Sequence, residues 1–142
     1  MTEQQELALK LENQLCFPLY AASKTVIAKY RPILEDLNLT YTQYITMMVL
    51  WEHKGIHLKE LGNILFLDSG TLTPLIKKLE ERGYLSRVRE INDERNVLIS
   101  LTKEGLALKE KAKFVPFEIS KCFNLTVEEA KTLYNLLYKI LG

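Results

Sequence analysis

The fold of this chain is decided by residues 68–83, DSGTLTPLIKKLEERG. Asp68 has the short oxygen-bearing side chain that caps a helix N-terminus, and Gly83 is typical of the position after a C-terminus. At about 100° per residue, the leucines and Ile76 gather on one face, while small, polar or basic side chains occupy the other. The stretch therefore predicts a helix that ends at Arg82, with one buried face and one open face.

A shorter amphipathic helix precedes this one. Its apolar residues recur at three- and four-residue steps, at Leu58, Leu61, Ile64 and Leu65. Two short helices joined by a tight turn form a helix-turn-helix. Residues 42–52 predict a further helix in front of it, which the basic residues and the glycine of 53–55 bring to an end.

Beyond Gly83 the apolar spacing changes from helical to alternating. Residues 84–88 and 97–101 alternate apolar and polar side chains on either side of a charged tip at 90–96, which predicts a β-hairpin. Thr102 then opens a helix that runs toward Phe114, and a capping box at 126–129 opens a last helix.

The N-terminal segment has apolar residues at helical spacing from Glu6 to Lys29, which predicts one long helix. Pro18 should bend it close to Cys16, and Pro32 should help to end it. The predicted fold is mainly α with a small β-wing: one domain over 1–142, with a winged helix-turn-helix at about 40–101. The terminal helices, at about 5–30 and 103–141, carry more leucine than so small a domain can cover, so we expect them to join two copies into a homodimer.

The composition excludes several classes of protein. A formal net charge of +1 does not by itself indicate nucleic-acid binding, so any such function depends on local arrangement. The N-terminus lacks the features of a secretory signal, and no stretch is long and apolar enough to span a bilayer. Cys16 and Cys122 lack metal-ligand spacing, and His53 and His57 lack further ligands. We expect a cytoplasmic protein with no metal, no cofactor and no membrane partner.

The open face of the 68–83 helix is small, polar and basic, and such a face fits a major groove. Arg95 in the hairpin tip is placed to enter a minor groove. The candidate DNA-binding residues are Ser69, Thr71, Thr73, Pro74, Lys77, Lys78, Arg87, Arg89 and Arg95. The residues alone leave open a plain solvated helix face and a hairpin tip held by surface ion pairs.

Residues 68–75, 93–95 and 99–102 resemble the recognition helix and wing of the MarR family of transcriptional regulators. Residues 15–20 and 39–44 are similar to the branch of organic hydroperoxide sensors that includes OhrR, SarZ and MgrA. The resemblance implies a homodimeric repressor, not an enzyme, that binds a pseudo-palindromic operator in double-stranded DNA. One recognition helix would enter each of two successive major grooves.

The resemblance also implies that Cys16 is the peroxide-sensing cysteine, with Tyr20 and Tyr30 as hydrogen-bond donors to its sulfur and Tyr41 as a further neighbour. Such a cysteine reacts as the thiolate, which hydroxyl donors and helix N-termini stabilise. Oxidation would release the operator. Cys122 is either a resolving thiol from the other subunit or buried filler, and in the second case a low-molecular-weight thiol would cap Cys16.

Other functions are also compatible with these residues. A MarR-type repressor can instead respond to a phenolic ligand in the dimer cleft, with Cys16 incidental. A thiol-based global or virulence regulator would use the same cysteine for a wider set of genes. A thiol peroxidase would use Cys16 as its catalyst, although the sequence has no thioredoxin-like βαβ pattern.

Overall fold

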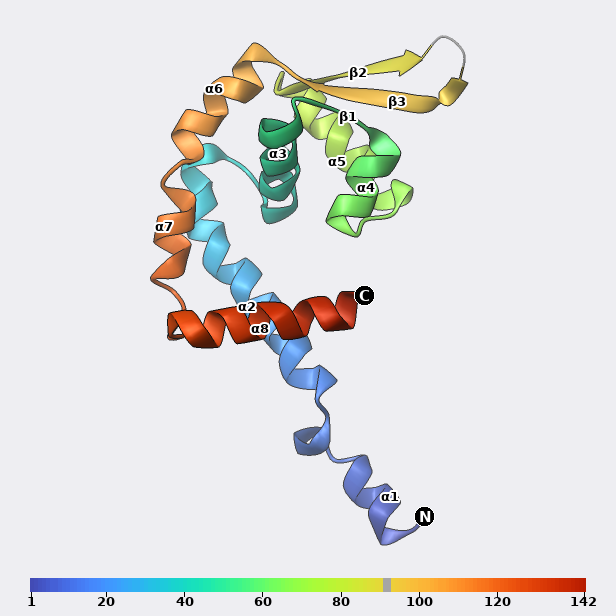
Figure 1. Cartoon of the computed structure of the whole chain (residues 1–142), viewed down its shortest axis with the longest axis vertical. Helices are drawn as coiled ribbons and strands as arrows, with labels where there is room; N and C mark the ends of the chain where they lie inside the picture. The colour runs from blue at the N-terminus through green and yellow to red at the C-terminus, as the bar shows by residue number, and fades with distance from the viewer. Residues whose placement is uncertain (91–92) are drawn as a thin grey trace.

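A computed structural model describes residues 1–90 and 93–142 of the chain, with all their side chains except those of 93–95. Figure 1 shows a group of short helices and strands at one end of the molecule, from which long helices near both termini extend. We call residues 41–101 the head. The predicted wing residue Arg95 lies in a strand of the head, but its side chain falls outside the described part.

The head contains three helices, α3 (Tyr41–His53), α4 (Leu58–Leu65) and α5 (Ser69–Glu81), and three strands, β1 (Gly55–His57), β2 (Leu85–Glu90) and β3 (Asp93–Leu101). The strands form an antiparallel sheet in the order β1-β3-β2. Ile99 of β3 lies opposite Ile56 of β1 on one side and Arg87 of β2 on the other. The arrangement is a helix-turn-helix followed by a hairpin, so the predicted fold class is confirmed.

The predicted helix caps are formed. The Asp68 carboxylate accepts a hydrogen bond from the Thr71 backbone N–H at 2.7 Å and starts α5. Thr102 caps α6 (Lys103–Ala112) in the same way through Gly105, and Thr126 forms a capping box with Glu129 at the start of α8 (Val127–Leu141). Each cap satisfies backbone donors that have no partner within the helix.

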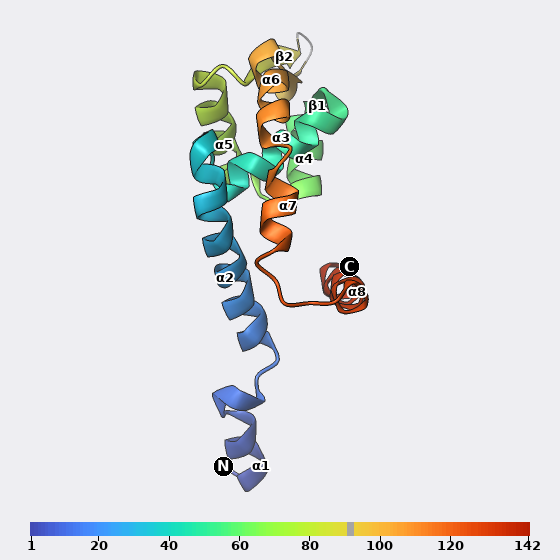
Figure 2. The same cartoon turned by 90° about the vertical axis from the view of Figure 1, so that its left-hand side faces the viewer.

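The core lies inside the head. Its fully buried side chains come from α3, α4, α5 and the sheet, with Leu34 and Val115 added from outside: Leu34, Met47, Leu50, Leu61, Leu72, Ile76, Leu79, Leu85, Ile99 and Val115. By contrast, α1 (Glu3–Ala8) and α8 contain no buried residue, and α2 (Cys16–Leu34) contains only one. Figure 2 shows α2 beside α7 (Val115–Ser120), while α8 stands apart from both.

The prediction of one helix from Glu6 to Lys29 is wrong. The chain leaves the helical path between α1 and α2 and forms only a short 3₁₀ turn, η1 (Leu11–Asn13). The Asn13 and Gln14 amides donate to the carbonyls of Leu7 and Ala8, which a continuous helix would use for its own backbone. Side chains that compete for backbone acceptors therefore interrupt the apolar pattern without any proline.

Both prolines also act differently from the prediction. Pro18 lies in the first turn of α2, where its missing N–H removes no helical hydrogen bond, so it does not bend a longer helix. Pro32 lies within α2, which continues to Leu34 before the 3₁₀ turn η2 (Glu35–Leu37). The interruption predicted near Val115 is confirmed, because α6 ends at Ala112 and α7 begins at Val115. Across the described residues, no helix combines the length and apolar character needed to cross a membrane.

Candidate functional site

The outer face of α5 is open, as the sequence predicts. Ser69, Thr71, Thr73, Pro74 and Lys77 are exposed, while the opposite face of the helix is buried in the core. The backbone N–H of Thr71 lowers the pKa of the Asp68 carboxyl, so the cap is ionised at neutral pH. The helix is thus anchored on one side and presents small and polar groups on the other, which suits a groove in DNA.

Arg87 is one of the predicted DNA-binding residues, and the structure gives it a partner inside the head. Its Nε and Nη2 lie 3.1 and 2.9 Å from Oε1 of Glu80, and its backbone N–H donates to Oε2 at 3.1 Å. This hydrogen-bonded ion pair joins β2 to α5 and lowers the pKa of Glu80. A contact of Arg87 with DNA stays a prediction. Arg89, two residues on, is exposed.

The hairpin is also held near its tip, at the end of β2. His57 Nε2 and Glu90 Oε1 lie 2.7 Å apart, and the Asn96 amide donates to the other oxygen of Glu90 at 3.3 Å. Between the hairpin and α5 lies a pocket of about 310 Å³, lined in part by Thr73, Arg87 and Arg89. Three predicted DNA-binding residues therefore lie on the same concave surface.

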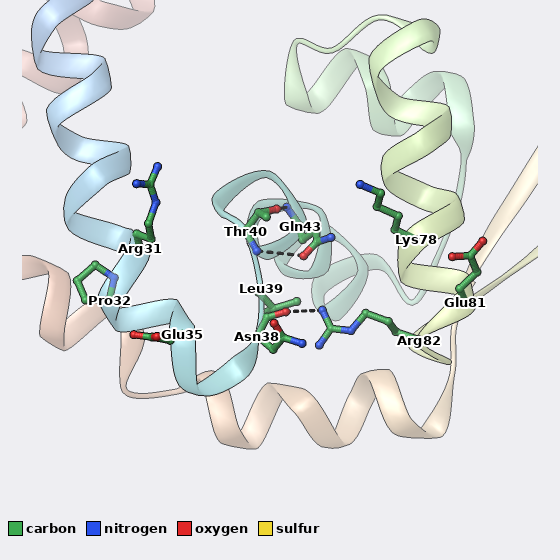
Figure 3. A pocket seen from close by; sticks show the side chains of 10 residues that line it. All are labelled: Arg31, Pro32, Glu35, Asn38, Leu39, Thr40, Gln43, Lys78, Glu81 and Arg82. Carbon is green, nitrogen blue, oxygen red and sulfur yellow. Dashed lines mark hydrogen bonds between the residues drawn. The ribbon is translucent and has the colours of Figure 1, made fainter.

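A larger groove of about 650 Å³ lies on the other flank of α5, between this helix, α2 and the start of α3 (Figure 3). Arg82 lines it and connects the end of α5 to the residues between α2 and α3. Its guanidinium donates to the carbonyls of Leu37 and Asn38 and lies 4.9 Å from the ring centre of Tyr84. Local spacing predicts no role for Arg82, because the two carbonyls that it contacts lie more than forty residues away in the chain.

A tight joint connects the head to α6. Trp51 Nε1 donates to the Gly105 carbonyl at 2.8 Å, and the Thr102 hydroxyl donates to the carbonyl of Gly83. A Cβ added to Gly105 would lie 2.1 Å from the Tyr84 carbonyl oxygen, so only glycine fits. The backbone of α6 thus touches the backbone that follows α5.

Cys16 is the first residue of α2, and its side chain is exposed between Leu15, which is 82% exposed, and Phe17. The backbone N–H groups in this first turn have no helical acceptors and stabilise negative charge nearby. Tyr20 follows one turn later and is also exposed, with Lys24 Nζ 5.2 Å from its ring centre. Within the described part of the chain, the Cys16 sulfur makes no hydrogen bond.

The other two tyrosines predicted for the thiol lie elsewhere. The rings of Tyr30 and Tyr41 pack 4.7 Å apart, and Tyr44 lies 5.9 Å from Tyr30. Burial and the neighbouring Tyr41 and Tyr44 raise the pKa of Tyr30 to about 12, so its hydroxyl stays a hydrogen-bond donor at neutral pH. Tyr30 follows Cys16 by 14 residues of α2, or about 21 Å along the axis, so the structure does not bring them together within one chain.

Cys122 follows α7 and is half-buried, with its sulfur 3.7 Å from the Glu118 carbonyl oxygen. Both cysteines are free thiols. Among the residues that the structure describes, no group of three or more histidine, cysteine or acidic side chains is placed to hold a metal ion.

Residues 28–112 match the family model described as transcriptional regulator SarA/Rot. The chain is 48% identical to the organic hydroperoxide resistance transcriptional regulator of Bacillus subtilis over 133 residues, which cover 94% of this chain and 90% of that protein. It is 45% identical to the regulator SarZ of Staphylococcus saprophyticus over 91% of each chain.

Solved structures of AbfR from Staphylococcus epidermidis are similar over their whole length. Reduced AbfR bound to DNA is 34% identical and superimposes with a TM-score of 0.79 over 99% of this chain and 97% of that one. AbfR with a disulfide formed gives a lower TM-score of 0.63 over 99% and 96%.

Proposed function

Because this chain belongs to the SarA/Rot group of MarR-type transcriptional regulators, we propose that it is a dimeric, cytoplasmic repressor that leaves its operator when an organic hydroperoxide oxidises Cys16. The observation that carries the proposal is the exposed sulfur at the first residue of α2, in a chain 48% identical to a hydroperoxide-resistance regulator. Membership of this family makes the protein a regulator of transcription and not an enzyme.

The DNA-binding half of the proposal uses α5 and the hairpin. The open face of α5 would enter the major groove, with Ser69, Thr71, Thr73, Pro74 and Lys77 near base edges and phosphates. Arg89 of β2 and Arg95 of β3 would approach the flanking minor groove. Because the Glu80–Arg87 pair fixes the hairpin against α5, the two parts would reach DNA as one surface.

The sensing half of the proposal is a two-electron oxidation of sulfur. The Cys16 thiolate attacks one oxygen of the hydroperoxide, the O–O bond breaks, and the sulfur becomes a sulfenic acid while the peroxide leaves as an alcohol. Leu15 and Phe17 make the surroundings apolar, which favours organic hydroperoxides. A second thiol then condenses with the sulfenic acid to give a disulfide and water.

The site needs two copies of the chain. If Tyr30 and Tyr41 are to donate to the Cys16 sulfur, the distance of about 21 Å along α2 requires that they come from the second subunit. The uncovered apolar side chains of α1, α2 and α8 provide the surface for such a pairing. We therefore assign residues 40–101 to DNA binding, and about 5–30 and 103–141 to the dimer.

Two thiols can complete the oxidation. Cys122 lies just before the exposed α8 and would serve as the resolving cysteine if the dimer brings it to Cys16 of the other subunit. A disulfide needs Cα atoms within about 4.4 to 6.8 Å, so the terminal helices would move if the reduced pair lies farther apart. If Cys122 stays out of reach, a low-molecular-weight thiol caps Cys16 instead.

The test begins with an operator selected from random double-stranded DNA by the reduced protein. Wild-type protein should bind this duplex, lose most of its affinity after one equivalent of cumene hydroperoxide, and regain it with dithiothreitol. Cys16→Ser should bind as tightly as the reduced wild type and ignore the peroxide. Mass spectrometry under reducing and nonreducing conditions, with Cys122→Ser as the matched control, identifies the second thiol.

Loss of DNA binding by peroxide-treated Cys16→Ser would disprove the sensing role of that sulfur. Release by an aromatic acid, together with indifference to peroxide, would instead establish a ligand-responsive repressor. Steady consumption of hydroperoxide with a dithiol in excess would instead support a thiol peroxidase that uses Cys16 as its catalyst.

A further inference from the structure

Two of the cations that line the groove beside α5 lie on opposite sides of it. Arg31 from α2 and Lys78 from α5 stand on opposite walls, with Thr40 and Gln43 between them (Figure 3). In the described part of the chain neither cation forms an ion pair or a hydrogen bond. Arg82 differs, since it is engaged by backbone carbonyls. The groove therefore offers two positive charges that the fold itself does not use.

The acidic residues of the groove do not neutralise these cations directly. Glu35 and Glu81 line it, but in Figure 3 both side chains point away from the space between Arg31 and Lys78. Neither carboxylate lies within ion-pair distance of Arg31 or Lys78 in the described structure. The two cations are thus free to meet an anion from outside.

The groove follows the flank of the proposed recognition helix. Thr71, Pro74 and Lys78 are spaced i, i+3 and i+7, so they share one face of α5. The hairpin lies along another flank, where Glu80 binds Arg87. A helix about 10–12 Å wide in a major groove about 12 Å wide has a phosphate backbone along each side. The backbone that does not meet the hairpin would run past Lys78 and over the groove.

We propose that this groove receives the phosphodiester backbone of the bound DNA, with Arg31 and Lys78 each contacting a phosphate. The proposal rests on the DNA-binding function proposed above and extends its surface from the head to α2. Arg82 has a positioning part, because it holds the end of α5 against the residues that join α2 to α3. Phosphate contacts of this kind are independent of base sequence.

The experiment measures the salt dependence of DNA binding. Fluorescence anisotropy follows Arg31→Gln, Lys78→Gln and the double variant on a duplex of about 30 base pairs, which spans two half-sites. Because a dimer carries two copies of each residue, each single variant should reduce the slope of log K against log salt by about 1.8, and the double variant by about 3.6. The reduction should be the same on the selected operator and on a shuffled duplex.

Lys29→Gln is the matched control, because it removes the same charge from an exposed position of the same helix that does not line the groove. Its slope should equal that of the wild type. Arg31→Lys keeps the charge and should restore most of the slope. Thermal unfolding of each variant checks that the head remains folded.

The proposal is overturned if Arg31→Gln and Lys29→Gln give the same slope. That result is separate from failure of the proposed function, which would appear as wild-type protein that does not prefer the selected duplex or does not respond to peroxide. In that case the shuffled duplex still tests whether Arg31 and Lys78 contact phosphates, because such contacts do not depend on the operator sequence.

Discussion

Gly105 shows how much a single residue can determine at the joint between head and α6. Replacement by alanine would place a Cβ 2.1 Å from the Tyr84 carbonyl oxygen, so the backbone must shift. We expect Gly105→Ala to lower the free energy of unfolding by about 1–3 kcal/mol, as overpacking usually does. Urea unfolding of the reduced protein measures the change.

Gly70→Ala is the matched substitution. The nearest atom to an added Cβ there is a carboxylate oxygen of Asp68 at 3.5 Å, an ordinary contact, so this variant should lose no stability. Equal unfolding curves for the two variants would show that the joint tolerates a larger separation than the structure has.

The sequence predicts the roles of some site residues but not of others. The Asp68 cap and the open face of α5 depend on neighbours within one helix, so local spacing predicted them. The Arg87 pair with Glu80 and the Arg82 contacts with Leu37 depend on the chain folding back on itself. Nothing in the local pattern distinguishes a cation that meets DNA from one that meets a carboxylate of the same fold.

The attachment of β2 to α5 leads to a prediction about pH. Because Arg87 lowers the pKa of Glu80, the pair stabilises the fold above the ordinary carboxyl pKa near 4.5, and this contribution disappears as the pH falls through the lowered value. Glu80→Gln should therefore be less stable than wild type at pH 7, and the difference should disappear at an acidic pH at which Glu80 of the wild type is protonated. Both side chains are about one third exposed, so we expect a modest difference.

Urea unfolding at the two pH values measures this difference. Glu110→Gln is the control, since its ion pair with Lys113 lies at the end of α6 and is much more exposed. The DNA affinity of Glu80→Gln should also fall, because the hairpin loses its tie to α5. Unchanged affinity and unchanged stability at pH 7 would contradict the role given to the pair.

At the level of elements, strong local signals were reliable and weak ones were not. The capped helices begin where the sequence places their caps. Strand β1 has only three residues, too few for an alternating pattern, and exists because β3 offers it a partner. The break between α1 and α2 was missed because apolar spacing continues through it, while Asn13 and Gln14 compete for the backbone.

The whole molecule is incomplete as a single chain. On α8, Leu133, Leu136, Leu137 and Ile140 recur at helical spacing, and the helix buries none of its residues. Leu133→Glu places a charge in the surface that we assign to the dimer, so it should shift the protein toward monomer and weaken DNA binding strongly. Analytical ultracentrifugation over a range of protein concentrations measures the shift.

Asn135→Glu adds the same charge on the opposite side of α8 and should leave the association unchanged. If Leu133→Glu sediments like the wild type, this face of α8 does not join the subunits.

The joint at Gly105 leaves little freedom between the head and the helix that carries it. Because Trp51 and Thr102 both form hydrogen bonds across this joint, a displacement of α6 is transmitted to the head and is not absorbed there. The head should consequently tilt as a rigid lever. The two heads must stay about one helical turn of DNA apart to reach both half-sites. Oxidation of one subunit alone should therefore be enough to move the two recognition helices out of alignment.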